Sequence, residues 1–430
     1  MNSSPAQDTM PFMAEDFPEA GKQKTFVAIA LVLAIKIVTW GAGLALSHAG
    51  LTFNESDYLH QFHHFRIDDP VAGKRERSFW DLWNFADSEW YLSIAATGYP
   101  TRKQALEGQR MPALPFRYTE KDSFLKYAFF PLFPVVISVC APWLGVEPAA
   151  FLITLIAGLA AAAAFVFLFG QAFPRRHDVQ IYALLLLFLY PFSVFYNLYH
   201  SESLFLLLSL LCFIALRSGR YFLMMLLGFL LCLTRPNGMF ITVPLLYGIH
   251  QQLRSASATP QSGHRARYLF ALAIPLGVLP YVFLNRRNMG DWLFFSTVQS
   301  SWGNAITSIS LNLWTNLVSK GIHFFSLQFH RFHSSQLDYV VTILLGIGMI
   351  AMWRDREFPR DLTLWAGILW IVPLLSKDLM SVSRYSCSLF PVFMFLALKF
   401  GPRTLRIILA FFTAGYFLAL TRVVQYGWLG

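Results

Sequence analysis

The sequence predicts an all-α protein that crosses a membrane many times. Of its 430 residues, 56% are hydrophobic and only 13% are charged, whereas soluble globular domains carry about 25% charged residues. Apolar runs of roughly 17 to 25 residues are typical of helices that span a bilayer. A scan for such runs gives eleven predicted crossings, at residues 25–47, 149–171, 179–198, 202–217, 221–234, 237–250, 268–285, 337–353, 362–376, 386–400 and 404–421.

The first predicted span follows a polar tail, residues 1–24, which holds Asp8, Glu15, Asp16 and Glu19. The apolar run that comes next is about 20 residues long, which exceeds the apolar core of a signal peptide. We therefore expect a retained first helix and a cytoplasmic tail.

A further apolar run, "YAFFPLFPVVISVCAPWL" at residues 127–144, is interrupted by three prolines. Short cytoplasmic loops carry an excess of Lys and Arg. If this run enters the membrane without crossing it, and the amino terminus is inside, the basic clusters at the span ends all fall on the cytoplasmic side. A full crossing would separate Arg175–Arg176 from Arg217–Arg220. The charge pattern therefore favours a re-entrant or interfacial segment.

This topology places two long polar segments outside, residues 48–126 and 286–336. Loops of this length are usually functional or disordered. The part from Ser78 to Tyr99 is too rich in Trp, Phe and Tyr for disorder. We expect amphipathic helices on the membrane surface there, and one membrane-embedded domain over residues 1–430.

The net charge of +10 fits basic loops that face anionic lipid better than it fits nucleic acid. The four cysteines lie in or beside apolar runs without CxxC spacing, so neither a zinc site nor a disulfide framework is indicated. His60 and His64 have the spacing of a helical zinc pair, but no glutamate lies between them and no third ligand is evident. We expect no metal and no cofactor.

Short motifs of polar and aromatic residues recur at the predicted outer ends of the spans. In "DSEWYLSIAATGY" (87–99) an aspartate precedes an aromatic pair, Ile-Ala and Gly-Tyr. Ionisable groups at membrane depth are costly unless they pair, snorkel or face a cavity, so they are functional candidates; the alternative is interface anchoring. The other motifs are "AFFPLFP" (128–134), "YHSESLF" (199–205), "TRPNG" (234–238), "GDWLFFSTVQSSW" (290–302) and "SRY" (383–385).

In order and composition, these six motifs resemble those of the GPI mannosyltransferase II (PIG-V type) family, over roughly residues 25–400. The resemblance implies a GT-C glycosyltransferase that takes a sugar from a polyprenyl phosphate on the outer or lumenal side. The chain departs from the family in having Ala86 where a tryptophan commonly precedes the aspartate, and it lacks an obvious acid shortly after Gly98–Tyr99. These departures bear on the acceptor and the sugar more than on the reaction class.

Attack by a sugar hydroxyl requires a positioned carboxylate to accept its proton. Asp87 is the predicted general base, and Glu89 is the second choice. The alternative for Asp87 is an N-cap of the helix that begins at Ser88.

The phosphate of the leaving group requires fixed cationic donors, which we assign to Arg235 and Arg384. Either could instead snorkel to the interface. Displacement from a β-linked donor would invert the anomeric centre without a covalent enzyme intermediate.

Glu202, with His200 and Ser201, could bond sugar hydroxyls or hold Arg235 in place. Alternatively, Glu202 serves only as an acid at a helix amino terminus. Amides and an indole ring suit sugar binding, whereas we expect Tyr99 to shape a lipid groove. The predicted substrate-binding set is Tyr91, Tyr99, His200, Glu202, Arg235, Asn237, Gln299, Trp302, Arg384 and Tyr385.

Two other functions compete with this one. A secondary transporter would show internal repeats and polar residues at mid-membrane, and neither is evident. A flippase or other non-catalytic lipid transporter would also need basic phosphate ligands, but it would not need Asp87. The family default is a mannosyltransferase. Short loops favour a bacterial inner-membrane protein whose site faces the periplasm or the exterior. The acceptor is then a glycan, a glycolipid or a protein.

Overall fold

The computed structural model describes residues 20–49, 65–66, 78–107, 117–118, 123–255, 264–299, 309–319, 334–376 and 381–425. In the amino-terminal half the elements are α1 (Ala20–His48), η2 (Asp81–Trp83), α3 (Ser88–Thr97), α4 (Arg102–Glu107), η3 (Ser123–Ala128), α5 (Leu132–Leu144), α6 (Val146–Ala172), α7 (Gln180–Phe188), η4 (Pro191–Asn197) and α8 (Glu202–Arg217). Strands β1 (Phe65–Arg66) and β2 (Arg117–Tyr118) form one short antiparallel pair.

All elements of regular secondary structure in the described part of the carboxyl-terminal half are helices. Its elements are α9 (Tyr221–Cys232), η5 (Pro236–Ile241), α10 (Thr242–Ser255), α11 (His264–Ala273), η6 (Ile274–Val278), α12 (Leu279–Met289), α13 (Phe294–Gln299), α14 (Ile309–Trp314), η8 (Thr315–Ser319), α16 (Ser334–Arg354), α17 (Arg360–Leu374), α18 (Val382–Tyr385), η9 (Ser386–Ser388), α19 (Phe390–Lys399) and α20 (Pro402–Val424).

The predicted all-α, multi-pass membrane architecture is confirmed. Within the described residues, five helical runs are long and apolar enough to cross a membrane: α1, α6, α16, α20 and the run Ala266–Met289. A sixth is formed if α7 and η4 count as one span with a 76° bend. Pro191 stands at this break, where its missing N–H cannot continue the helix.

Fewer helices of the described chain are long enough to cross by themselves than the eleven crossings expected. Several predicted spans are occupied by shorter helices, namely α8 with 16 residues, α9 with 12, α10 with 14, α17 with 15 and α19 with 10. By length alone these helices fall short of a full crossing. Whether each reaches both faces therefore stays a prediction.

The proline-interrupted run at 127–144 folds as η3 followed by α5. Helix α5 has 13 residues, so it is about 20 Å long against about 30 Å of hydrocarbon. Gly145, with φ of 86°, links it directly to α6. These dimensions suit the expected segment that enters without crossing, and its placement in a membrane stays a prediction.

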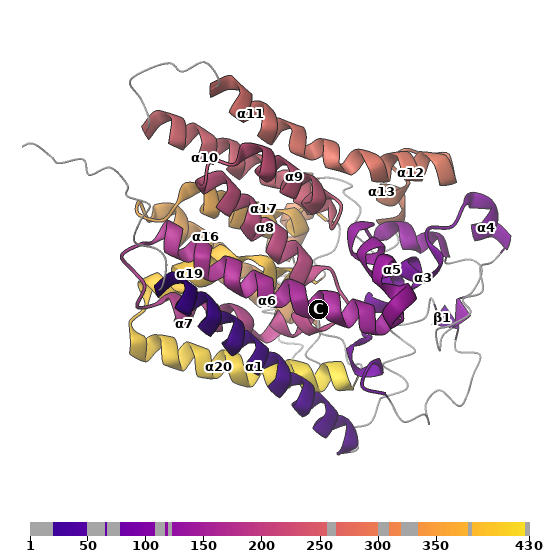
Figure 1. The fold of residues 1–430 in the computed structure, drawn as a ribbon, viewed down its shortest axis with the longest axis horizontal. Helices are drawn as coiled ribbons and strands as arrows, with labels where there is room; N and C mark the ends of the chain where they lie inside the picture. Colours follow the sequence, from indigo (N-terminus) through magenta and orange to yellow (C-terminus); the bar gives the residue numbers. More distant parts are fainter. Residues whose placement is uncertain are drawn as a thin grey trace, which may run out of the picture.

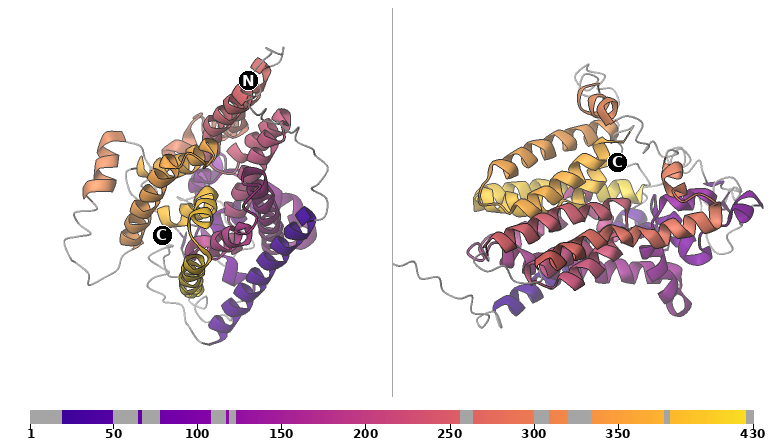
Figure 2. Two further views of the ribbon diagram at one scale, coloured as in Figure 1. Left: turned by 90° about the vertical axis from the view of Figure 1, so that its left-hand side faces the viewer. Right: turned by 90° about the horizontal axis from the view of Figure 1, so that it is seen from above.

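Helix α3, in the described part of the first long loop, packs against one end of the bundle. Most helices run along the long axis of the molecule, and α3, α4, α5 and α13 gather at one end (Figure 1), which the views of Figure 2 also show. Helix α3 packs against α5 and α6, and Ser88–Ile94 are all buried. The expectation of amphipathic surface helices is therefore wrong for α3, because its polar residues also face protein.

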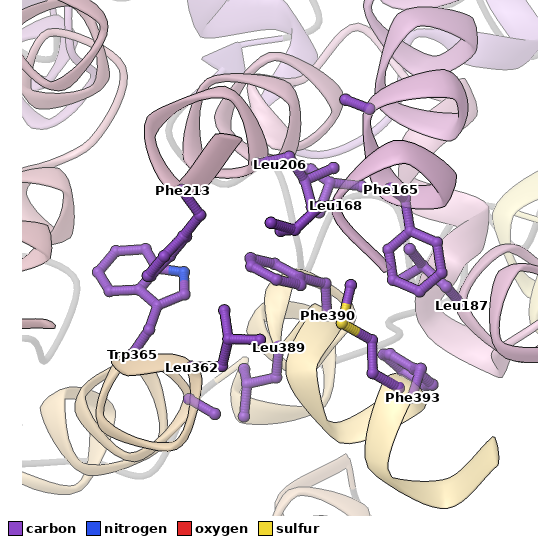
Figure 3. Packing of buried hydrophobic residues seen from close by; sticks show 14 of the residues in the cluster. Phe165, Leu168, Leu187, Leu206, Phe213, Leu362, Trp365, Leu389, Phe390 and Phe393 are labelled. Atoms are coloured by element: carbon purple, nitrogen blue, oxygen red, sulfur yellow. The ribbon is translucent and has the colours of Figure 1, made fainter. Parts of the chain in front are cut away.

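The main apolar core lies between α6, α7, α8, α17 and α19. Figure 3 shows Phe165, Leu206, Phe213, Trp365 and Phe390 converging from these helices. All five side chains are at most 1% exposed. This packing fixes the separation of α8 and α19, which border the polar site described below.

One glycine permits close contact between α9 and η6. A Cβ atom built on Gly277 would lie 2.6 Å from the Phe229 carbonyl oxygen and 2.8 Å from its Cα. Because both obstacles are backbone atoms, a larger residue would force the two elements apart.

We therefore expect Gly277→Ala to lower stability by roughly 1–3 kcal/mol, as overpacking does. The measurement is the apparent Tm in detergent, followed by tryptophan fluorescence. Gly348→Ala is the matched control, because nothing lies within 4 Å of a Cβ at this α16 position and alanine is the better helix former. Equal Tm values for the two variants would contradict the packing argument.

Candidate active site

Four predicted site residues meet in one ion-pair cluster at the end of the bundle beside α3. Arg384 Nη1 lies 2.5 Å from Asp87 Oδ2, and Arg384 Nε lies 2.6 Å from Glu202 Oε1. Arg235 Nη2 is 2.5 Å from the same Glu202 oxygen. The side chain of Glu202 is fully buried, whereas that of Asp87 is 27% exposed. Segments distant in the sequence thus place two carboxylates and two guanidiniums together.

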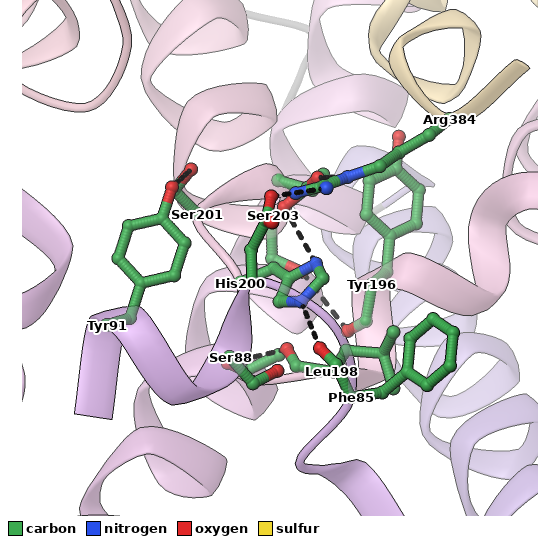
Figure 4. A network of polar contacts seen from close by, with 12 residues as sticks. Phe85, Ser88, Tyr91, Tyr196, Leu198, His200, Ser201, Ser203 and Arg384 are labelled. Carbon is green, nitrogen blue, oxygen red and sulfur yellow. Dashed lines mark hydrogen bonds and ion pairs between the residues drawn. The ribbon is translucent and has the colours of Figure 1, made fainter. Parts of the chain in front are cut away.

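A hydrogen-bonded chain extends the cluster to α3. Arg235 Nε donates to Ser201 Oγ at 2.9 Å, and the Tyr91 hydroxyl lies 3.0 Å from that oxygen. Burial raises the pKa of Tyr91 to about 12, so its hydroxyl stays neutral near pH 7. Figure 4 shows Tyr91 and Ser201 side by side, with Arg384 on the other side of the network.

His200 packs beneath the acids. Its Nε2 lies 2.8 Å from the Phe85 carbonyl oxygen and its Nδ1 lies 3.7 Å from Glu202 Oε2 (Figure 4). The ring is fully buried. His200 therefore joins the loop before α3 to the start of α8, and its ring is enclosed by protein.

The backbone before α3 aims Asp87 at the cluster. Ala86 has φ of 50°, a left-handed conformation that costs an L-residue about 1–2 kcal/mol. Asp87 stands at the N-cap position but makes no capping hydrogen bond with its side chain. The N-cap alternative for Asp87 therefore does not describe its side chain, which pairs with Arg384 instead.

Local sequence also explains how Arg235 reaches the cluster. The residue before a proline is disfavoured in the helical region, and Arg235 is extended before Pro236, with φ of −156° and ψ of 150°. Helix α9 accordingly ends at Cys232. A Cβ on Gly238 would overlap the Leu231 carbonyl, so the glycine of "TRPNG" lets η5 pack directly against the end of α9.

Aromatic rings flank both guanidinium groups. The Tyr385 ring centroid lies 5.5 Å from Arg235 Cζ and 5.9 Å from Arg384 Cζ. Phe195 lies 5.1 Å from Arg384 Cζ on the buried side. Cation–π contacts of this kind stabilise a buried guanidinium without satisfying its N–H donors.

Glu89 is buried and lies apart from these ion pairs. It is 2% exposed, and its Oε2 has no hydrogen-bond partner among the described residues. Burial raises the pKa of Glu89 to about 8. A neutral, enclosed carboxyl is a poorer proton acceptor near pH 7 than the partly exposed Asp87.

The remaining predicted site residues lie in other places. The Tyr99 hydroxyl donates to the Phe129 carbonyl at 2.5 Å, and Gln299 Nε2 donates to the Ala128 carbonyl at 2.9 Å, so both support the "AFFPLFP" segment. Asn237 is half-buried on η5, and Trp302 lies outside the described residues.

No group of three or more metal-ligating side chains occurs in the described part of the chain. His60 and His64 lie outside that part. A cavity of about 420 Å³ lies at the other end of α8, beside Arg217 and Asp361, and contains none of the cluster residues.

Sequence reasoning named Ser201, together with His200 and Glu202, as a group that could hold Arg235, and Arg235 Nε donates to Ser201 Oγ. It missed Phe195 as a partner of Arg384. Ser201 is part of the motif "YHSESLF", which was the signal for that prediction. Phe195 carries no such signal, because it lies in an apolar run and reaches Arg384 only through the fold.

Comparison with known proteins shows similarity only at the level of solved structures. No family model and no curated protein matches the chain. The structure of ArnT from Cupriavidus metallidurans bound to undecaprenyl phosphate is 13% identical with a TM-score of 0.48, and the match covers 93% of this chain and 76% of ArnT. The PIG-V resemblance therefore remains a hypothesis carried by the six motifs.

Two structures from Archaeoglobus fulgidus also match. The apo oligosaccharyltransferase is 11% identical with a TM-score of 0.44. The oligosaccharyltransferase AglB, in complex with an inhibitory peptide and a dolichol-phosphate, is 11% identical with a TM-score of 0.40. Each match covers 92% of this chain but only 56% of the archaeal protein, so this chain spans just over half of their length.

We expect Glu89→Gln to stabilise the protein increasingly as the pH rises. The pKa of Glu89 in the folded protein is about 8, above the ordinary 4.5. Burial therefore disfavours the ionised carboxylate in the folded state, and this lowers the stability of the wild type most once the pH exceeds both values. This loss of stability is absent below pH 4.5 and grows between pH 4.5 and about 8. Glutamine does not titrate, so the variant escapes the loss. The measurement is the difference in apparent Tm between variant and wild type at about pH 5 and about pH 8. A difference that is constant with pH would contradict the assignment.

Proposed function

We propose that this protein is a glycosyltransferase that moves a sugar from a polyprenyl phosphate donor to an acceptor hydroxyl. The observation that carries the proposal is the convergence of Asp87, Glu202, Arg235 and Arg384. A partly exposed carboxylate beside two fixed guanidiniums is the arrangement that hydroxyl attack on a phosphate-activated sugar requires.

Asp87 is the general base in this proposal. Its Oδ2 accepts from Arg384, while Oδ1 has no hydrogen-bond partner among the described residues. Glu202 is unsuited to this role because it is fully buried between two arginines. Its task is to hold both guanidiniums, one of the alternatives that the sequence left open.

Arg235 and Arg384 are the ligands of the donor phosphate. Their positive charges are balanced by Asp87 and Glu202 in the unliganded cluster. A phosphate oxygen that approaches Arg384 competes with Asp87 for its N–H groups. Donor binding then weakens the Arg384–Asp87 pair and leaves Asp87 a better proton acceptor.

The proposed step is a single displacement. The acceptor hydroxyl passes its proton to Asp87 while its oxygen forms a bond to the anomeric carbon. The bond from that carbon to the phosphate oxygen breaks, and its electron pair stays with the polyprenyl phosphate on Arg235 and Arg384. Attack opposite the leaving group inverts the anomeric centre.

The finer assignments rest on the motif resemblance. We propose mannose as the sugar, and a glycan, glycolipid or protein as the acceptor. The cluster lies at the helix ends that the charge pattern places outside, so the site would face the periplasm of a bacterial inner membrane.

We expect Asp87→Asn to reduce sugar transfer by about 10²- to 10⁴-fold, because general base catalysis contributes that much. The assay follows radiolabelled polyprenyl phosphate mannose into membrane extracts at matched expression. Glu89→Gln is the control for loss of an acid two residues away, in α3, and it should retain transfer.

Loss of transfer in Glu89→Gln but not in Asp87→Asn would move the base to Glu89. A different outcome would favour a non-catalytic lipid transporter. In that outcome the wild type binds the donor but transfers no sugar, whichever polyprenyl phosphate sugar and membrane extract are supplied.

We expect Arg384→Lys to raise the half-saturating donor concentration by about tenfold. Lysine keeps the positive charge but cannot make the two forked hydrogen bonds of arginine. A hydrogen bond to a charged group is worth roughly 1.5–3 kcal/mol. Arg217→Lys is the matched control. Arg217 pairs with Asp361 at 2.9 Å at the opposite end of α8. Equal donor affinities in the two variants would contradict the phosphate role of Arg384.

A further inference from the structure

Arg384 is carried by a helix of only four residues, α18 (Val382–Tyr385). So short a helix cannot hold its own shape, because the N–H groups of its first turn have no partners within the helix. Ser381 precedes it but makes no capping hydrogen bond with its side chain. The groups that satisfy this turn must therefore come from elsewhere in the fold.

Asp338, near the start of α16, supplies them. Its Oδ2 accepts from the Ser381 N–H at 2.9 Å, and its Oδ1 accepts from the Ser383 N–H at 2.7 Å and from the Ser383 hydroxyl. Asp338 is 1% exposed. Hydrogen bonds to a buried carboxylate are among the strong ones, so one side chain of α16 fixes the start of α18.

The backbone at this point needs such a restraint. Ser381 has φ of 61° and ψ of 20°, a left-handed conformation that persists in a non-glycine residue only where surrounding contacts enforce it. After α18, the Ser386 hydroxyl bonds the Ser383 carbonyl and the Tyr190 hydroxyl, the latter at 2.8 Å. The turn before Arg384 is thus held from two directions.

We infer that Asp338 is a positioning residue for Arg384. Its carboxylate fixes the first turn of α18 and thereby directs the guanidinium toward Asp87 and Glu202. The consequence for the donor phosphate rests on the proposed function. Because Asp338 bonds the Ser381 and Ser383 N–H groups, its effect on Arg384 passes through the backbone of residues 381–383.

The first experiment needs no substrate. Apparent Tm values are measured for Asp338→Asn, Arg384→Ala and the double variant. If Asp338 acts through Arg384, the loss in the double variant is smaller than the sum of the single losses. Asp361→Asn is the control for loss of a buried acid far from the cluster, and its loss should add to that of Arg384→Ala.

The second experiment measures binding of undecaprenyl phosphate to protein in nanodiscs. We expect Asp338→Asn to weaken binding by about tenfold in the wild-type background and to have no further effect beside Arg384→Ala. Asp338→Glu, which keeps the carboxylate, should recover part of the affinity. Asp361→Asn should leave the affinity unchanged.

Additive losses of Tm would overturn the inference whatever the substrate is. Non-additive losses of Tm together with no binding of undecaprenyl phosphate by the wild type would support the positioning of Arg384 and count against the proposed function. Weakened binding that persists unchanged in the Arg384→Ala background would also overturn the inference, because Asp338 would then act by another route.

Discussion

The arrangement of the site depends on Glu202, whose single oxygen Oε1 accepts from both Arg235 and Arg384. A buried charge without partners costs several kcal/mol, so each of the three groups requires the others. Glu202 is the first residue of α8, where the helix dipole also favours a negative charge. This shared acid ties the end of α9 and the short helix α18 to the start of α8.

Helix α8 connects two ion-paired ends through an apolar middle. Its first residue belongs to the cluster, and its last residue, Arg217, pairs with Asp361. Between them, Leu206 and Phe213 pack into the core at no more than 1% exposure. Movement of α8 along its axis would disturb polar contacts at both ends. The core therefore sets the position of the cluster as much as the ion pairs do.

The site is also held by irregular backbone. Ala86 and Ser381 are the two non-glycine residues with positive φ in the described part of the chain. One directly precedes Asp87, and the other lies three residues before Arg384. Strained backbone of this kind persists where the surrounding structure enforces it and is common at functional sites. The positive-φ residues Ala86 and Ser381 lie next to Asp87 and near Arg384, the ion pair to which we assign the reaction.

The sequence by itself determined the membrane class, the position of most helices and the motifs that supply the site, because hydropathy and charge act locally along the chain. It also indicated Asp87, Glu202, Arg235 and Arg384 as separate candidates. Only the tertiary structure decided that Glu202 holds both arginines, that Glu89 is enclosed, and that Asp338 restrains α18. Those outcomes depend on contacts between segments distant in sequence, for which no local pattern exists. The packing of α3 was missed for the same reason, since α5 and α6, which pack against it, are distant from it in the sequence.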